Sequence, residues 1–455
     1  MSQAVLEPGA SSAPKLPSFA AALRVWLRIG LLSFGGPAGQ IALLHREVVD
    51  QRRWIGERRF LHALNYCALL PGPEATQLAT YIGWLMHGAR GGLAAGLLFI
   101  VPGVVVMMGL SIVYAVWGTV PLVAGLFFGL KAAVLVLVIE ALLRIARRAL
   151  KGGMAWCVAG IAFVALFVFN LPFPLVVLAA GAVGALRPGW FVGGSHGKAA
   201  QGATPALLDA LLEAEPQRVP KLARSARRAG VVALVLWLVP VALLLPIGGV
   251  FGDIAWFFSK MAVVTFGGAY AVLAYVAQEA VQHYHWLSAQ EMLAGLGLAE
   301  TTPGPLILVL QFVGFMAGYR ADGLGLAGGA LGALLTLWVT FAPCFVFVFL
   351  GAPLVERLQA NRIFAGALAG ITAAVVGVIA NLALWFGLRV LFGTLHAVAL
   401  GPIVLDLPAI ATIDARAVLV AALAVLTLFA LRQGLVRTLA ICAGAGLLLQ
   451  LVAAG

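Results

Sequence analysis

The sequence predicts an all-α, polytopic membrane protein. We expect two inverted six-segment repeats joined by a linker transmembrane helix, with broken or re-entrant helices at two Gly/Pro motifs. Of the 455 residues, 63% are hydrophobic and only 10% are charged, whereas soluble domains carry roughly 25% charged residues. The same two motifs recur 232 residues apart. Basic residues gather in particular loops, which is how helices are oriented in a membrane.

Apolar segments follow one another in the order six, one, six. Most are close to the ~20 residues that a helix needs to cross ~30 Å of hydrocarbon. They span 19–43, 61–87, 92–117, 121–143, 154–169, 171–186, 231–249, 253–276, 289–317, 324–350, 363–388, 411–431 and 436–453. The predicted organisation is a disordered N-terminus (1–18), a first repeat (19–186), a cytoplasmic loop (187–229), a linker helix (230–250) and a second repeat (251–455).

The odd number of segments between matching motifs predicts that the second repeat is upside down. Loop 44–60 carries five arginines, whereas its counterpart 276–292 carries no Lys or Arg. Because basic loops stay in the cytoplasm, the first loop is expected inside and the second outside. This favours hairpins that enter and return at the first two segments, and full crossing is the alternative.

The recurring motifs are Ser33–Gly36 with Thr265–Gly268, and Leu70–Pro73 with Thr302–Pro305. Glycine frees the backbone, and proline suits the first position of a restarting helix. Unwound backbone inside a membrane is tolerated only against protein or a wet cavity. A helix restart there offers free N–H groups and the positive end of a dipole, which suit a small anion. The candidate binding residues are Phe34, Gly35, Gly36, Pro37, Gly39, Gln40, Pro71, Gly72, Pro73, Thr76, Gln77, Lys131, Phe266, Gly267, Gly268, Pro303, Gly304 and Pro305.

Charged residues within apolar segments are further candidates. Lys131 stands in an apolar run, where a charge costs roughly 3 kcal/mol, so it either contributes to anion binding or reaches the interface. Glu74 follows Pro73, and it either stabilises a helix start or takes up a proton for coupling. Glu140 is expected to pair with Arg144 one helical turn later. We expect no metal site and no cofactor, since His283 and His285 lack a third ligand.

The motifs also resemble those of the chromate ion transporter family, in its long-chain, two-repeat form. The resemblance rests on Phe34-Gly35-Gly36-Pro37 with Gly39-Gln40, on Pro71-Gly72-Pro73, and on their second-half counterparts. It implies export of chromate, with sulfate or a similar tetrahedral oxyanion as a further substrate, driven by the proton motive force across the inner (plasma) membrane. The second half departs from the pattern at Ala269-Tyr270-Ala271, so two unequal half-sites are expected.

Other functions remain as alternatives at this stage. An anion channel or a sulfate-type oxyanion transporter would suit the same motifs. A membrane-embedded enzyme is disfavoured because the sequence offers no convincing nucleophile–base pair, and no GxxxxGK[ST] run points to ATP. The net charge of +12 is attributed to orienting loops rather than to nucleic acid. The expected partners are the oxyanion, protons and the lipid bilayer, with a homodimer as one option for the oligomeric state.

Overall fold

The computed structural model describes residues 16–191, 206–215, 217–266, 268–321, 323–351, 362–400 and 403–454. Most of these residues are helical, and the predicted all-α membrane fold is confirmed. Within these described ranges, six helical stretches are long and apolar enough to cross a membrane: Glu74–Trp117, Pro121–Ala149, Arg218–Leu244, Gly325–Gly351, Arg362–Leu391 and Leu435–Val452. Most of the N-terminal stretch predicted to be disordered lies outside the described residues.

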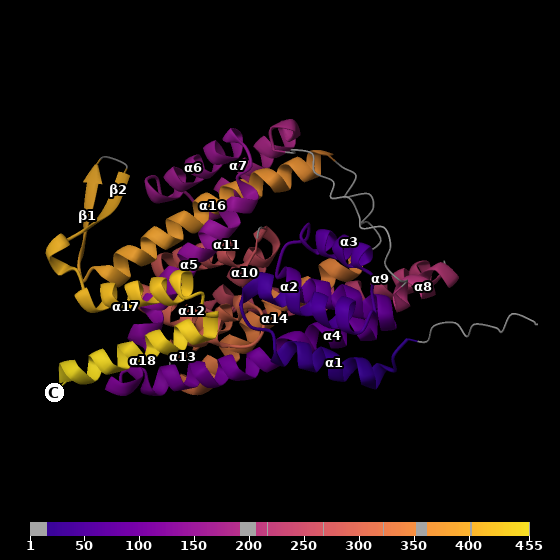
Figure 1. Ribbon diagram of the computed structural model, residues 1–455, viewed down its shortest axis with the longest axis horizontal. Helices are drawn as coiled ribbons and strands as arrows, with labels where there is room; N and C mark the ends of the chain where they lie inside the picture. Colours follow the sequence, from indigo (N-terminus) through magenta and orange to yellow (C-terminus); the bar gives the residue numbers. More distant parts are fainter. Residues whose placement is uncertain are drawn as a thin grey trace, which may run out of the picture.

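The first half runs from α1 to α7 (Figure 1). Its elements are α1 (Phe19–Leu31), α2 (Gly36–His45), the π-helix η1 (Arg46–Gln51), α3 (Glu57–Cys67), α4 (Glu74–Trp117), α5 (Pro121–Ala149), α6 (Gly153–Phe167), α7 (Phe173–Leu186) and the 3-10 turn η2 (Pro188–Trp190). The centre of the chain forms α8 (Leu207–Ala214) and α9 (Arg218–Leu244). The linker helix α9 therefore begins inside the stretch expected to be a loop.

The second half repeats this order with one addition. Its elements are α10 (Gly249–Val264), α11 (Ala269–Ala277), the π-helix η3 (Gln278–His283), α12 (Ala289–Thr301), the 3-10 turn η4 (Leu306–Leu308), α13 (Val309–Arg320), α14 (Gly325–Gly351), α16 (Arg362–Leu391), β1 (Leu395–Leu400), β2 (Ile403–Pro408), the 3-10 turn η6 (Ile410–Thr412), α17 (Ala415–Val425), the π-helix η7 (Leu426–Ala430) and α18 (Leu435–Ala454). The antiparallel β1–β2 hairpin was not predicted.

The first two pairs of helices form hairpins. The ring of Phe19, where α1 begins, lies 5.6 Å from that of His87, where the first part of α4 ends. Trp26 on α1 also lies 6.0 Å from Trp54, which follows α2. The chain thus enters and returns at one end of the molecule, first through α1 and α2 and then through α3 and α4. Helix α4 breaks at His87–Gly88 and turns back across the molecule.

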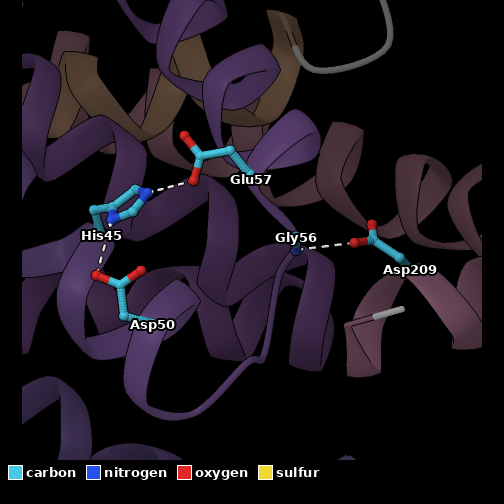
Figure 2. Close-up of polar contacts among 5 residues, drawn as sticks. All are labelled: His45, Asp50, Gly56, Glu57 and Asp209. Carbon is cyan, nitrogen blue, oxygen red and sulfur yellow. Dashed lines mark hydrogen bonds and ion pairs between the residues drawn. The ribbon is translucent and has the colours of Figure 1, made fainter. Parts of the chain in front are cut away.

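Polar contacts secure the open end of these first hairpins (Figure 2). His45, the last residue of α2, lies 3.3 Å from Asp50 and 2.5 Å from Glu57 at the start of α3. The carboxylate of Asp209 on α8 accepts a hydrogen bond from the amide of Gly56 at 2.9 Å and also pairs with Arg59. Because α8 leads into the basic start of α9, this end corresponds to the predicted cytoplasmic side.

The corresponding end of the second-half hairpins faces the other way. Gln278, at the end of α11, donates to Asn170 between α6 and α7 at 3.1 Å. Gln290 on α12 donates to the carbonyl of Arg389 near the end of α16. In Figure 1, α3, α8 and α9 lie toward one end of the long axis, and β1, β2 and the C-terminus lie at the other. The two repeats are therefore inverted, as predicted.

The two repeats match down to single backbone features. The π-helices η1 and η3 begin at Arg46 and Gln278, 232 residues apart. After each, a tryptophan amide returns to the preceding helix: Trp54 donates to Val48 at 2.8 Å, and Trp286 donates to Ala280 at 2.9 Å. Such detail in the backbone is what an internal duplication leaves behind.

Candidate functional site

The hairpin turns adopt backbone conformations that favour glycine and proline. Helix α1 ends at Leu31, and the chain reverses through Gly35 and Gly36, which have φ angles of 89° and 69°. Pro37 then occupies the first turn of α2. Gly72 and Gly304 have φ angles of 114° and 102° in the two Pro-Gly-Pro turns, a region that side chains with a Cβ rarely enter. The predicted breaks are therefore present at both motifs.

Backbone hydrogen bonds cross between the two halves at these turns. The amide of Gly72 donates to the carbonyl of Thr265 at 3.1 Å, and the amide of Gly304 donates to the carbonyl of Ser33 at 2.7 Å. The two donors are 232 residues apart, and so are the two acceptors. Each Pro-Gly-Pro turn is thus bonded to the Phe-Gly-Gly turn of the opposite repeat, which brings all four turns together.

Two long helices close over the turns. A Cβ built on Gly103 of α4 would lie 2.0 Å from the carbonyl oxygen of Pro303, so α4 approaches that turn as closely as a glycine permits. On the other side, the sulfur of Cys344 on α14 would lie 3.2 Å from a Cβ on Gly72. Pro303, Gly304 and Cys344 are buried. The Pro303–Gly304 turn therefore lies inside the protein, whereas Phe34 in the first Phe-Gly-Gly turn is 37% exposed.

The start of α4 is the most favourable anion site in this arrangement. No side chain caps it, and Ala75, Thr76 and Gln77 are buried. A buried helix start normally has its free N–H groups satisfied. In the described part of the chain, Thr76 Oγ1 and Gln77 Oε1 are also buried without a hydrogen-bond partner. Unpaired amides, a helix dipole and the free hydroxyl of Thr76, which can donate, together suit a small anion.

The first-half polar residues also hold the turns in shape. Gln40 is buried and donates to the carbonyl of Gly304 at 2.6 Å, so it crosses to the opposite repeat. Gln77 donates to the carbonyl of Pro71 at 2.7 Å and braces its own turn. The matching second-half positions are Val272 and Val309. The half-sites are unequal for this reason, in line with the sequence expectation.

The second-half turns are less open than the first. Helix α11 begins at Ala269, after Gly268, without a side-chain cap. Pro305 leads only into the 3-10 turn η4, and α13 begins at Val309, whereas Pro305 was expected to start a helix directly. Phe266 is half-buried, and Gly267 lies outside the described residues.

Lys131 and Glu74 occupy different surroundings. Lys131 lies on α5, where the charge of Glu291 near the start of α12 reaches it. In the described part of the chain it makes no hydrogen bond or ion pair with a turn. Glu74 is the first residue of α4 and likewise has no hydrogen bond or ion pair among the described residues. Glu140 pairs with Arg144, as expected.

Sequence reasoning missed two sets of residues near the turns. Glu300 on α12 is 5% exposed, and the hydroxyl of Tyr270 donates to its Oε1 at 2.8 Å. A carboxylate inside an apolar segment is itself a functional signal. The matching residue of the first repeat is Ala68, so Glu300 is not part of a repeated motif. Arg437, near the start of the last apolar segment, lines a cavity of about 400 Å³ beside Phe34 and Gly35.

The family model for chromate transporters matches residues 20–185 and 252–448, which covers both repeats. The chain belongs to the chromate transporter family. The chromate transport protein of Pseudomonas aeruginosa is 32% identical over 359 residues, covering 78% of this chain and 77% of the relative. That of Cupriavidus metallidurans is 25% identical over 355 residues, covering 78% and 79%.

A relative without an assigned substrate also matches over most of the chain. An uncharacterized transporter of Methanocaldococcus jannaschii is 25% identical over 370 residues, covering 80% of this chain and 83% of its own. No solved structure matches the chain. Membership in the chromate transporter family, together with the apolar helices, makes this a multi-pass membrane protein of a transport family.

Proposed function

We propose that this protein is a secondary transporter that exports chromate from the cytoplasm across the inner membrane, and that sulfate or a similar tetrahedral oxyanion shares its site. Relatives over most of the chain are named chromate transport proteins. The observation that carries the proposal is the buried, uncapped start of α4 beside the unpartnered hydroxyl of Thr76. A tetrahedral dianion has the charge and size that such a helix start accommodates.

In this proposal the oxyanion lies among the four turns. The turn from Phe34 to Gly39 and that from Pro71 to Thr76 supply backbone N–H groups, with Gln40 and Gln77 holding their shape. The second half adds the smaller turns at Phe266–Gly268 and Pro303–Pro305. Lys131 contributes positive potential from the outer side, and Arg437 draws anions toward Phe34.

Export agrees with the energetics of a dianion. Moving one elementary charge across the membrane potential is worth about 2.3 kcal/mol per 100 mV, and two negative charges leaving a negative interior gain twice that. We propose that the proton motive force drives transport. A buried carboxylate beside the turns would bind the coupled proton, the role that the sequence suggested for Glu74.

A carrier accounts for the buried turns better than a channel. One cavity lies beside Phe34, and a second one, about 480 Å³, is lined by Asn170, Gln278 and Arg389; we propose that the crossed bonds Gly72–Thr265 and Gly304–Ser33 keep the two sides apart. Inverted repeats that rock around a central site open one side at a time. A channel would instead need a continuous path past the turns.

The test is uptake of labelled chromate into inverted membrane vesicles that contain the protein. We expect saturable uptake, inhibited by unlabelled sulfate more than by phosphate or molybdate, and accelerated by an imposed potential. Vesicles carrying Gly72→Val, which adds a side chain at a positive-φ turn, should lose uptake. Chromate flux equal to that of empty vesicles would refute the assignment, and flux that rises linearly without saturation would favour the channel.

A further inference from the structure

A buried carboxylate joins the tips of the two second-half hairpins. Glu300 is the second-to-last residue of α12, three residues before Pro303, and Tyr270 is the second residue of α11. Their hydrogen bond, 2.8 Å from the tyrosine hydroxyl to Oε1, is therefore a contact between hairpins. Both side chains are buried, with exposed fractions of 5% and 8%.

The surroundings of Glu300 contain few other ionisable groups. Among the described residues, Tyr270 on α11 is hydrogen-bonded to it, and the charges of Arg144 and Glu140 on α5 reach it. Arg144 pairs with Glu140, and its Nε is buried without a partner. Arg147 and Arg148 follow within the last turn of α5. Ionisable residues thus lead from the cytoplasmic end of α5 toward Glu300.

We propose that Glu300 is the residue that binds and releases the coupled proton, and that Tyr270 positions its carboxylate; this inference rests on the proposed transport function. A dianion arriving at the turns places negative charge near this carboxylate, and like charges disfavour each other's ionised state. The proton occupancy of Glu300 and the anion occupancy of the site are therefore linked, and the linkage acts in both directions.

Glu300 suits this role better than Glu74 for a structural reason. A proton can drive transport only if its binding changes a contact that differs between the two states of the carrier. Glu300 contacts a second hairpin through Tyr270. Glu74 makes no hydrogen bond to another element in the described part of the chain. Protonation of Glu300 changes the bond between α11 and α12 directly, because an ionised carboxylate accepts a stronger hydrogen bond than a neutral one.

The test uses proteoliposomes that contain a pH-sensitive dye, with labelled chromate added outside. The wild type should show a chromate-dependent change of internal pH. Glu300→Gln should still exchange labelled chromate across the membrane, but its pH change should fall at least tenfold and its exchange should become independent of pH. Glu213→Gln, on the exposed face of α8, should keep the pH change.

A second variant and a second readout separate the possible outcomes. Tyr270→Phe should still couple, with the midpoint of its pH profile displaced, and this variant decides the matter if Glu300→Gln does not fold. In difference infrared spectra of the purified protein, Glu300→Gln should lack a carboxyl band that changes on chromate binding. A full pH change in Glu300→Gln, or an unchanged profile in Tyr270→Phe, would overturn the inference. A wild type that moves no chromate would instead refute the proposed function.

Discussion

Replacing Gly103 by alanine tests whether α4 must approach the Pro303 turn as closely as the structure has it. The new Cβ would lie 2.0 Å from the carbonyl oxygen of Pro303 and 2.4 Å from Cδ1 of Leu308. One added methyl group in a tightly packed interior costs about 1–3 kcal/mol. The leucine tip can rotate away, but the backbone carbonyl cannot, so α4 or the turn must move.

Displacing the turn should reduce both stability and transport. The Pro303 turn contains Gly304, whose amide bonds to Ser33 and whose carbonyl accepts from Gln40. Each 1.4 kcal/mol against the closed arrangement lowers its population about tenfold. We therefore expect Gly103→Ala to melt at a lower temperature than the wild type and to take up chromate about tenfold more slowly or worse.

The matched control is Gly109→Ala on the same helix. Gly109 is exposed, and a Cβ there would have no neighbour within 4 Å. This substitution should change the free energy of unfolding by less than about 0.5 kcal/mol. The measurements are thermal melting in detergent and initial rates of chromate uptake at equal protein content. If Gly103→Ala and Gly109→Ala behave alike in both, the close packing of α4 on the turn is not needed.

Three further perturbations follow from contacts already described. Burial lowers the pKa of His45, but its hydrogen bond to Glu57 and the charges of Glu57 and Asp50 outweigh this and raise it above the usual 6.5. The stabilisation of the fold by protonated His45 is thus complete below pH 6.5 and is lost as the pH rises through the higher folded-state pKa. The melting temperature should fall over that pH range in the wild type but not in His45→Gln. Equal slopes of melting temperature against pH in the two proteins would contradict this. Gln40→Leu leaves the carbonyl of Gly304 unpaired and should cost about 1–3 kcal/mol, whereas Gln290→Leu, which removes an exposed contact, should have little effect; equal melting temperatures would count against the crossed contact. Asp209→Ala should destabilise the protein by about 1 kcal/mol relative to Glu213→Ala, and no difference in melting would show that α8 does not secure α3.

The hairpins were predictable because their signals are local and repeated. The positions where a helix stops and restarts are predicted by two motifs, Phe34-Gly35-Gly36-Pro37 and Pro71-Gly72-Pro73. The charges of the loops predict the side to which the chain returns. The prediction that the repeats are inverted was confirmed for the same reason. The backbone contacts between turns were not predictable, because the partners of Gly72 and Gly304 lie in the opposite repeat and no side-chain pattern records them.

Glu300 was not predicted as a functional residue because it has no counterpart in the first repeat. A search for residues present in both repeats discards a position where one repeat has Glu and the other has Ala68. The same bias directed attention to Glu74, which follows a repeated motif. Arg437 was not a candidate because it lies far from both motifs in the sequence, and only packing brings it beside Phe34. The β1–β2 hairpin escaped notice because its strands are short and apolar on both faces, so they lack the alternation typical of strands.

The crossed amide–carbonyl contacts between the repeats involve main-chain atoms alone. Point substitutions can change the side chains around these two hydrogen bonds without deleting a donor or an acceptor. The two repeats can therefore diverge in sequence while the hydrogen bonds between them are kept. Equally, the first repeat made by itself would leave the amide of Gly72 and the carbonyl of Ser33 without their hydrogen-bond partners. Only a second repeat with the opposite orientation in the bilayer could supply these partners.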